Sequence, residues 1–143
     1  MSRVLALFAL ITLLPPSAAA QDSTRACWDS AMSQASMNQC AGSDLQRSRD
    51  RMQSLLRELR SRLDSESRRG IDSVQRRWDA YSRAQCRWEG AAYDGGSMRP
   101  MIEASCLAQR TEERIAVLKP FLCGRENQVQ SCEAAKRYDR TGH

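Results

Sequence analysis

Six cysteines constrain the fold of this chain more than any other feature of its sequence. They are Cys27, Cys40, Cys86, Cys106, Cys123 and Cys132. An even number of cysteines in a short exported chain is typical of a disulfide framework, although six cysteines can pair in many ways. A metal site is the alternative, but the sequence has no Cys-x-x-Cys spacing and its one histidine, His143, is the last residue. We therefore predict three structural disulfides and no metal or other cofactor.

The first twenty residues have the pattern of a cleaved signal peptide. Arg3 supplies the positive start, residues 4–14 are apolar, and small residues lead up to Ala20. The apolar run is too short to span a bilayer. We expect a mature chain that begins at Gln21, does not span a membrane, and is periplasmic or secreted.

Residues 76–118 predict two long helices joined by a tight turn. Gly95 and Gly96 tolerate the positive φ angles that tight turns require. Ser97 is a candidate N-cap for the second helix. Pro100 suits the first turn of that helix, where its missing N–H would have had no partner. The pattern is that of a helical hairpin.

The two cysteines of this hairpin predict one disulfide from geometry alone. Cys86 lies ten residues before Gly96, and Cys106 lies ten residues after it. In an antiparallel hairpin the two side chains stand at the same height. A bridge between them would hold the open end of the hairpin, and it is the pairing that we favour most.

A further amphipathic helix is predicted upstream, from Ser43 to about Leu63. Ser43 and Gln46 have the spacing of a capping box, and leucines follow on one helical face. Before Ser43 we expect a short helix and a turn. Cys27 and Cys40 are too far apart to bridge along one straight helix, so their pairing requires a chain reversal, for which Asn38 or Gly42 is suited.

The middle helix is expected to begin after an Asp64 cap and to reach about residue 92. Its predicted buried stripe consists of Ile71, Val74, Trp78, Tyr81, Gln85 and Trp88. We interpret Trp78, Tyr81 and Trp88 as structural core anchors rather than as a ligand box. The third helix spans about 98–118 and ends at Pro120.

Together these elements predict an all-α fold, a disulfide-stapled antiparallel three-helix bundle with a short extra N-terminal helix. The expected domain organisation is a signal peptide over 1–20, a helical domain over 21–122, and a terminal segment over 123–143. That segment is expected to form a polar loop closed by cysteines and a disordered tail, because residues 133–143 are charged and contain few apolar side chains.

Much of the chain resembles a known family, the LprI-type lysozyme inhibitors. The matching positions are Cys27, Met37 to Ala41, Val74 to Trp78, Tyr81, Arg83, Cys86, Gly95 to Ser97, Cys106, Thr111, Arg114 and Leu118. So many matches in order are specific. The resemblance implies an exported protein that inhibits lysozyme, with lysozyme as its protein partner. The chain departs from the family pattern after Asp50, where it has Gln53, Ser54 and Arg57.

The resemblance also bears on the disulfides. Four cysteines match the family pattern, whereas Cys123 and Cys132 do not belong to it. The resemblance therefore implies that these last two pair with each other, and a Cys27–Cys40 bridge then completes the set.

Catalysis is disfavoured, because the helical domain contains no histidine and no GxSxG, HExxH or phosphate-loop motif. A binding protein is the preferred interpretation. The predicted partner-binding loop spans residues 91–99 and carries Tyr93, Asp94, Ser97 and Arg99. Arg99 could pair with a catalytic carboxylate of a lysozyme, and Tyr93 could fill a sugar subsite. A plain connection between two helices explains the same residues equally well.

Net charge supports a second hypothesis and argues against the first. The formal net charge is +5, with 22 Lys and Arg against 17 Asp and Glu, so a cationic lysozyme would be repelled at long range. A local acidic patch formed by Asp94, Glu103, Glu112 and Glu113 would offset this repulsion.

The second hypothesis is an envelope adaptor that binds an anionic polymer or a membrane surface through an arginine-rich helix. Its candidate residues are Arg47, Arg49, Arg51, Arg57, Arg60 and Arg62. Such binding should weaken strongly with added salt. Nucleic acid is disfavoured as a partner, because an exported chain is separated from cellular DNA and no aromatic pattern interleaves with the arginines.

Overall fold

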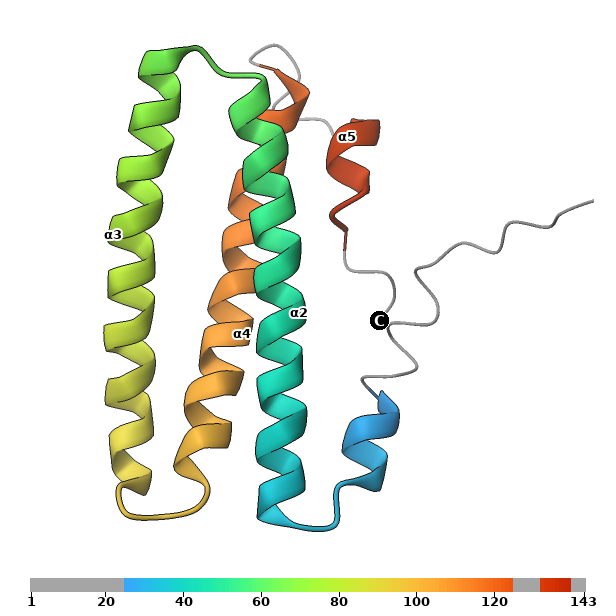
Figure 1. The fold of residues 1–143 in the computed structure, drawn as a ribbon, viewed down its shortest axis with the longest axis vertical. Coiled ribbons are helices and arrows are strands. Elements are labelled where there is room, and N and C mark those ends of the chain that lie inside the picture. Colours follow the sequence, from blue (N-terminus) through green and yellow to red (C-terminus); the bar gives the residue numbers. More distant parts are fainter. Residues whose placement is uncertain (1–24, 125–131, 140–143) are drawn as a thin grey trace, which may run out of the picture.

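The computed structural model describes residues 25–124 and 132–139, and all regular secondary structure within these ranges is helical (Figure 1). After a short helix over 25–30, the elements are α2 (Gln34–Ser61), α3 (Ser65–Gly90), η1 (Ala91–Tyr93), α4 (Arg99–Leu118), η2 (Lys119–Cys123) and α5 (Glu133–Lys136). The predicted all-α class is confirmed. The three long helices lie side by side, each reversing the direction of the one before, and α4 packs against both α2 and α3.

The hydrophobic core lies between α2, α4 and η2. Its buried members are Met52, Leu55, Leu56, Leu59, Ile115, Leu118 and Leu122. On α2 they recur at three- and four-residue steps, so they share one face of the helix. Ile71 and Trp78 of α3 pack against this cluster and are partly buried.

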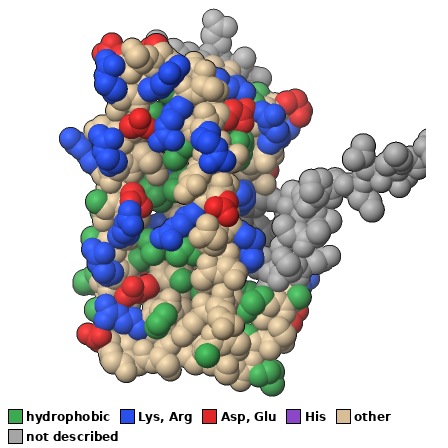
Figure 2. All heavy atoms as spheres, in the orientation of Figure 1, with side chains coloured by type: hydrophobic (Ala, Val, Ile, Leu, Met, Phe, Trp, Pro, Cys, Tyr) green, Lys and Arg blue, Asp and Glu red, His purple; other side chains and the backbone are tan. Residues whose placement is uncertain are grey.

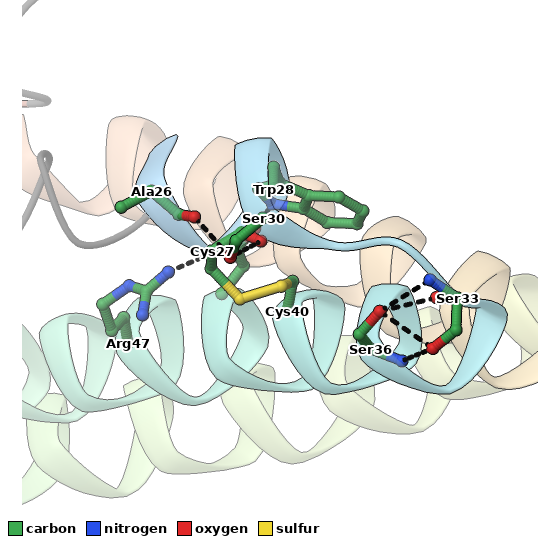
Figure 3. Close-up of a disulfide and its surroundings, with 9 residues drawn as sticks. Ala26, Cys27, Trp28, Ser30, Ser33, Ser36, Cys40 and Arg47 are labelled. Atoms are coloured by element: carbon green, nitrogen blue, oxygen red, sulfur yellow. Dashed lines mark hydrogen bonds and ion pairs between the residues drawn. A yellow bond between two sulfur atoms is a disulfide. The ribbon is translucent and has the colours of Figure 1, made fainter.

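The beginning of α2 differs from the prediction. The helix starts at Gln34, nine residues before Ser43, and its capping box is formed by Ser33 and Ser36 (Figure 3). Gln46 donates a hydrogen bond to Asp50 at 2.9 Å instead of closing a cap. Because buried Cys40 and Ala41 continue the apolar face of the leucines, packing extends the helix through this region.

All three predicted disulfides are present in the structure. The Cα atoms are 5.8 Å apart in Cys27–Cys40, and 5.6 Å apart in both Cys86–Cys106 and Cys123–Cys132. The first bridge joins the short helix over 25–30 to α2 (Figure 3). The reversal that it requires occurs at residues 31–33 and not at Asn38 or Gly42, which both lie inside α2.

The predicted buried face of α3 is wrong for most of its large side chains. Tyr81 is 60% exposed and Trp88 is 72% exposed, so neither is a core anchor, and Val74 is also exposed. Trp78 is partly buried against the core. The side chains that α3 buries are small: Ser82, Cys86 and Gly90. The Cys86–Cys106 bridge requires Cys86 to face α4, and residues four positions away share that face.

Part of the terminal segment is ordered, in contrast to the predicted disordered tail. Residues 133–136 form α5, where Ala135 is buried and Ala134 packs against the core. Tyr138 also packs against the core and donates a hydrogen bond to Glu58 at 2.9 Å. Sparse apolar residues suffice here because the Cys123–Cys132 bridge holds the segment near η2. The predicted signal peptide and residues 140–143 lie outside the described residues.

Candidate functional site

The predicted partner-binding loop forms the connection between α3 and α4. It begins with η1 and continues through a turn in which Gly95 has a φ angle of 74°, as only glycine adopts readily. Gly96 does not have a positive φ angle. A side chain there would nevertheless be crowded, because its Cβ would lie 3.2 Å from the Tyr93 carbonyl oxygen. Ser97 does not cap α4, which begins at Arg99 without a side-chain cap. Pro100 lies in the first turn of α4, as predicted.

Three contacts brace this loop. The Cys86–Cys106 bridge joins the two helices that carry it. Asn38 of α2 donates a hydrogen bond from its Nδ2 to the carbonyl oxygen of Ser97 at 3.0 Å. The two helices also approach closely, since a Cβ on Gly90 would lie 2.6 Å from Cγ of Glu103. The loop is therefore attached to all three long helices at one end of the molecule.

Arg99 is held between two carboxylates. Its Nε donates to Glu103 at 2.7 Å, and its Nη1 donates to Asp94 at 2.5 Å. These hydrogen bonds, first that with Glu103 and then that with Asp94, raise the pKa of Arg99 above its ordinary value. Sequence reasoning missed Glu103 as a partner, although its position four residues after Arg99 on one helix is the signal for such a pair.

The four carboxylates of the predicted acidic patch do not form a single patch. Glu112 pairs with Arg51 of α2 at 2.8 Å, and Glu113 pairs with Arg110 at 3.1 Å. Asp94 and Glu103 share Arg99, so this cluster keeps one excess negative charge. The Asp94 side chain is 73% exposed. Of these four carboxylates, only Asp94 and Glu103 lie together, at the junction of the loop and α4.

Exposed apolar side chains lie beside these charges. Tyr93 and Met98 flank the turn, and each is 40% exposed. The sequence pointed to Tyr93 but missed Met98, which the periodicity had placed at the start of the following helix. The loop therefore combines an aromatic ring, a flexible thioether and an arginine, which are residue types enriched in protein interfaces.

The arginine-rich face of α2 is largely neutralised within the domain. Four of its six candidate arginines form ion pairs with carboxylates: Arg47 with Asp44, Arg51 with Glu112, Arg60 with Asp72 and Arg62 with Glu58. Figure 2 shows Lys and Arg side chains spread over the visible face and interspersed with Asp and Glu. This arrangement does not support the polymer-binding hypothesis, which requires a concentrated cationic surface.

No helix within the described ranges of the chain is long and apolar enough to cross a membrane. Within the same ranges, no three His, Cys, Asp or Glu side chains are grouped so that they could hold a metal ion.

An all-helical domain with three disulfides is typical of small extracellular or periplasmic proteins. The comparison with known families then makes the assignment specific. The chain belongs to the family described as "Lysozyme inhibitor LprI", which matches residues 27–118. The description of the family names lysozyme inhibition as its activity.

One similar curated protein is an uncharacterized protein of Rhizobium meliloti (strain 1021). It is 40% identical over 57 residues, which are 40% of this chain and 41% of that protein. The chain thus matches less than half of the length of this relative. No solved structure matches the chain.

Proposed function

We propose that this protein is an exported inhibitor of lysozyme that inserts the α3–α4 loop, residues 91–99, into the substrate cleft of the enzyme. The observation that carries the proposal is the braced loop, which exposes Tyr93 and Asp94 at one end of the bundle. Because the loop is held by a disulfide and by Asn38, little ordering entropy is lost on binding. Family membership supports the choice of partner.

The charged cluster suits such a partner. Glycoside hydrolases of this kind carry a pair of carboxylates at the scissile bond. Arg99 can exchange Asp94 for an enzyme carboxylate while Glu103 keeps its guanidinium oriented. Asp94 is then free to pair with a basic side chain at the rim of a cationic enzyme, which offsets part of the long-range repulsion.

The test is the turnover of a cell-wall suspension by a cationic lysozyme, with and without an excess of the purified oxidised protein. We expect dose-dependent inhibition. Tyr93→Ala and Arg99→Ala should each weaken it about tenfold or more, since buried aromatic and Arg anchors contribute about 2 kcal/mol or more to binding.

Matched controls are available on α3. Tyr81→Ala removes another exposed tyrosine, and Arg83→Ala removes another arginine that is paired with a carboxylate, Asp79. Both controls should inhibit as the native protein does. Absence of inhibition at large excess would rule out this function for that enzyme class. Equal losses in control and loop variants would rule out the loop as the inserted element.

A further inference from the structure

A second surface, distant in sequence from the loop tip, has the features of a small-molecule site. It is a groove of about 790 Å³ between the first half of α3, the end of α4, and η2. That volume lies within the range of about 300–1,000 Å³ that is usual for ligand sites. Its walls include Ile71 and Val74 of α3 on one side and Val117 and Phe121 on the other.

Apolar surface remains exposed along this groove. Val74, Val117 and Phe121 are each about half-exposed. Exposed apolar side chains are common singly, but a contiguous set that lines a groove indicates binding. Val74 was predicted to be buried in the core, but its side chain lines the groove instead.

Arg114 lines the groove and differs from the other arginines of α4. Arg99 and Arg110 each pair with carboxylates, whereas Arg114 forms no ion pair within the described ranges. Its Nε donates to Gln75 at 3.1 Å, and its guanidinium carbon lies 5.9 Å from the centre of the Trp78 ring. Its Nη2 is shielded from solvent and has no hydrogen-bond partner among the described residues.

This environment leaves a positive charge only partly compensated. Removal from water lowers the pKa of Arg114 from its ordinary value. A desolvated cation is costly unless a partner of opposite charge accepts its hydrogen bonds. Neither Asp nor Glu occurs among the described residues that line the groove. The second arginine there, Arg62, is already engaged with the Leu122 carbonyl oxygen and Glu58, both at 2.6 Å.

We propose that the groove binds a single-chain anionic amphiphile of the fatty-acid class, with the chain between α3 and α4 and the carboxylate on Arg114. The carboxylate supplies the counter-ion that the Arg114 guanidinium lacks in the groove, and the apolar walls cover the chain. A purely polar anion would leave the apolar walls exposed, and a neutral or cationic amphiphile would leave Arg114 without its counter-ion. This inference is independent of the loop and of lysozyme.

The test compares two amphiphiles that have the same chain and opposite head-group charge. Isothermal titration of the oxidised protein with dodecanoate, below its micellar concentration, should show saturable binding at a single site. Dodecyltrimethylammonium should bind at least about tenfold more weakly. Arg114→Gln should weaken dodecanoate binding about tenfold or more, because a hydrogen bond to a charged group contributes about 1.5–3 kcal/mol.

Arg110→Gln is the matched control, since Arg110 lies one turn away and is paired with Glu113. It should bind dodecanoate as the native protein does. Val117→Glu is a second variant at an exposed position, and its carboxylate, three residues along the helix, should pair with Arg114 and compete with the ligand. Absence of saturable dodecanoate binding, or equal affinities of the Arg114 and Arg110 variants, would overturn the proposal.

Location can be checked through tryptophan fluorescence. Bromine-labelled dodecanoate should quench the emission of Trp78, which lies beneath Arg114. The quenching should disappear in Trp78→Phe and persist in Trp88→Phe, because Trp78 contacts Arg114, which lines the groove, whereas Trp88 is not part of this contact. The reverse pattern would place the ligand elsewhere and contradict the proposal.

Discussion

Helices α2 and α3 are of similar length, but they are held in the domain by different forces. α2 buries long aliphatic side chains, among them Leu55, Leu56 and Leu59, in the main core. α3 buries Ser82, Cys86 and Gly90 and exposes Tyr81 and Trp88. α2 is therefore stabilised mainly by hydrophobic burial, whereas much of α3 is held by a disulfide and by close approach to α4.

The difference shows that a small-residue contact can leave large side chains available for other tasks. Because α3 meets α4 through Cys86 and Gly90, the two backbones approach closely. Val74 is then turned toward the groove, and Tyr81 and Trp88 toward solvent, while Ile71 and Trp78 pack against the core. On α2, by contrast, the large apolar side chains are buried in the core.

The strongest test of this comparison is Leu55→Ala on α2. Leu55 is fully buried in the core, so its truncation leaves a cavity between α2 and α4. We expect the free energy of unfolding to fall by about 2–5 kcal/mol. Denaturant unfolding of the oxidised protein measures this change. A loss below about 1 kcal/mol would mean that α2 does not depend on burial as described.

The second test removes the bridge that holds α3. The double change Cys86→Ser with Cys106→Ser should lower the free energy of unfolding by about 3 kcal/mol, because the bridge closes a 20-residue separation in the unfolded chain. Removal of Cys123–Cys132, with a separation of 9, should have a smaller effect. An effect of the first change no larger than that of the second would contradict the assigned role of the bridge.

The third test uses the caps, which differ between the two helices. Asp64 accepts hydrogen bonds from Ser67 and Glu66 at the start of α3, whereas the neutral Ser33 caps α2. The hydrogen bond from the Ser67 backbone, followed by that from its hydroxyl, lowers the pKa of Asp64. Its contribution to stability is therefore complete above the ordinary carboxyl pKa of about 3.9 and is lost as the pH falls through the lower folded-state value.

Thermal melts of native protein and Asp64→Ser across this acidic range measure the effect. The native protein should have the higher melting temperature at neutral pH, and the difference should shrink on acidification. A difference that is independent of pH would show that the charge of Asp64 does not contribute. The matched change Ser33→Ala should lower stability by about 1 kcal/mol without this pH dependence.

The smallest effect is expected at the exposed aromatic residues of α3. Tyr81→Ala and Trp88→Ala should each change the free energy of unfolding by no more than about 0.5 kcal/mol, because both side chains are more than half exposed. The same denaturant experiment measures this. A loss of unfolding free energy close to that of Leu55→Ala would show that Tyr81 and Trp88 are buried in the core. It would contradict the described difference between α2 and α3.

Several features were predictable from local chemistry. The helical class followed from apolar periodicity, and the Cys86–Cys106 pairing followed from equal distances on either side of Gly96. The Asp64 cap and the position of Pro100 depend on the backbone of a single turn. The cysteine pairing also predicts which face of α3 is buried. Trp88 lies two positions after Cys86, about 200° around the helix, so the two side chains cannot both face α4.

At the candidate site, the sequence pointed to the loop and to Tyr93 but not to exposed Met98 or to the contacts that hold the loop. The Asn38 brace and the surroundings of the Arg114 guanidinium depend on contacts between helices, whereas the Arg99–Glu103 pair lies within one helix. The periodicity of apolar residues along one helix does not specify which neighbouring helix each of its faces will contact.

The sequence by itself determined the long helices, the Asp64 cap and the cysteine framework, since these depend on residues within a few turns of one another. Only the tertiary structure decided that α2 begins at Gln34, that small residues of α3 face α4, and that α5 folds back onto the core. The physical reason is competition for burial. Each helix offers more apolar surface than the bundle can cover, and the disulfides and the leucine core select which part is buried.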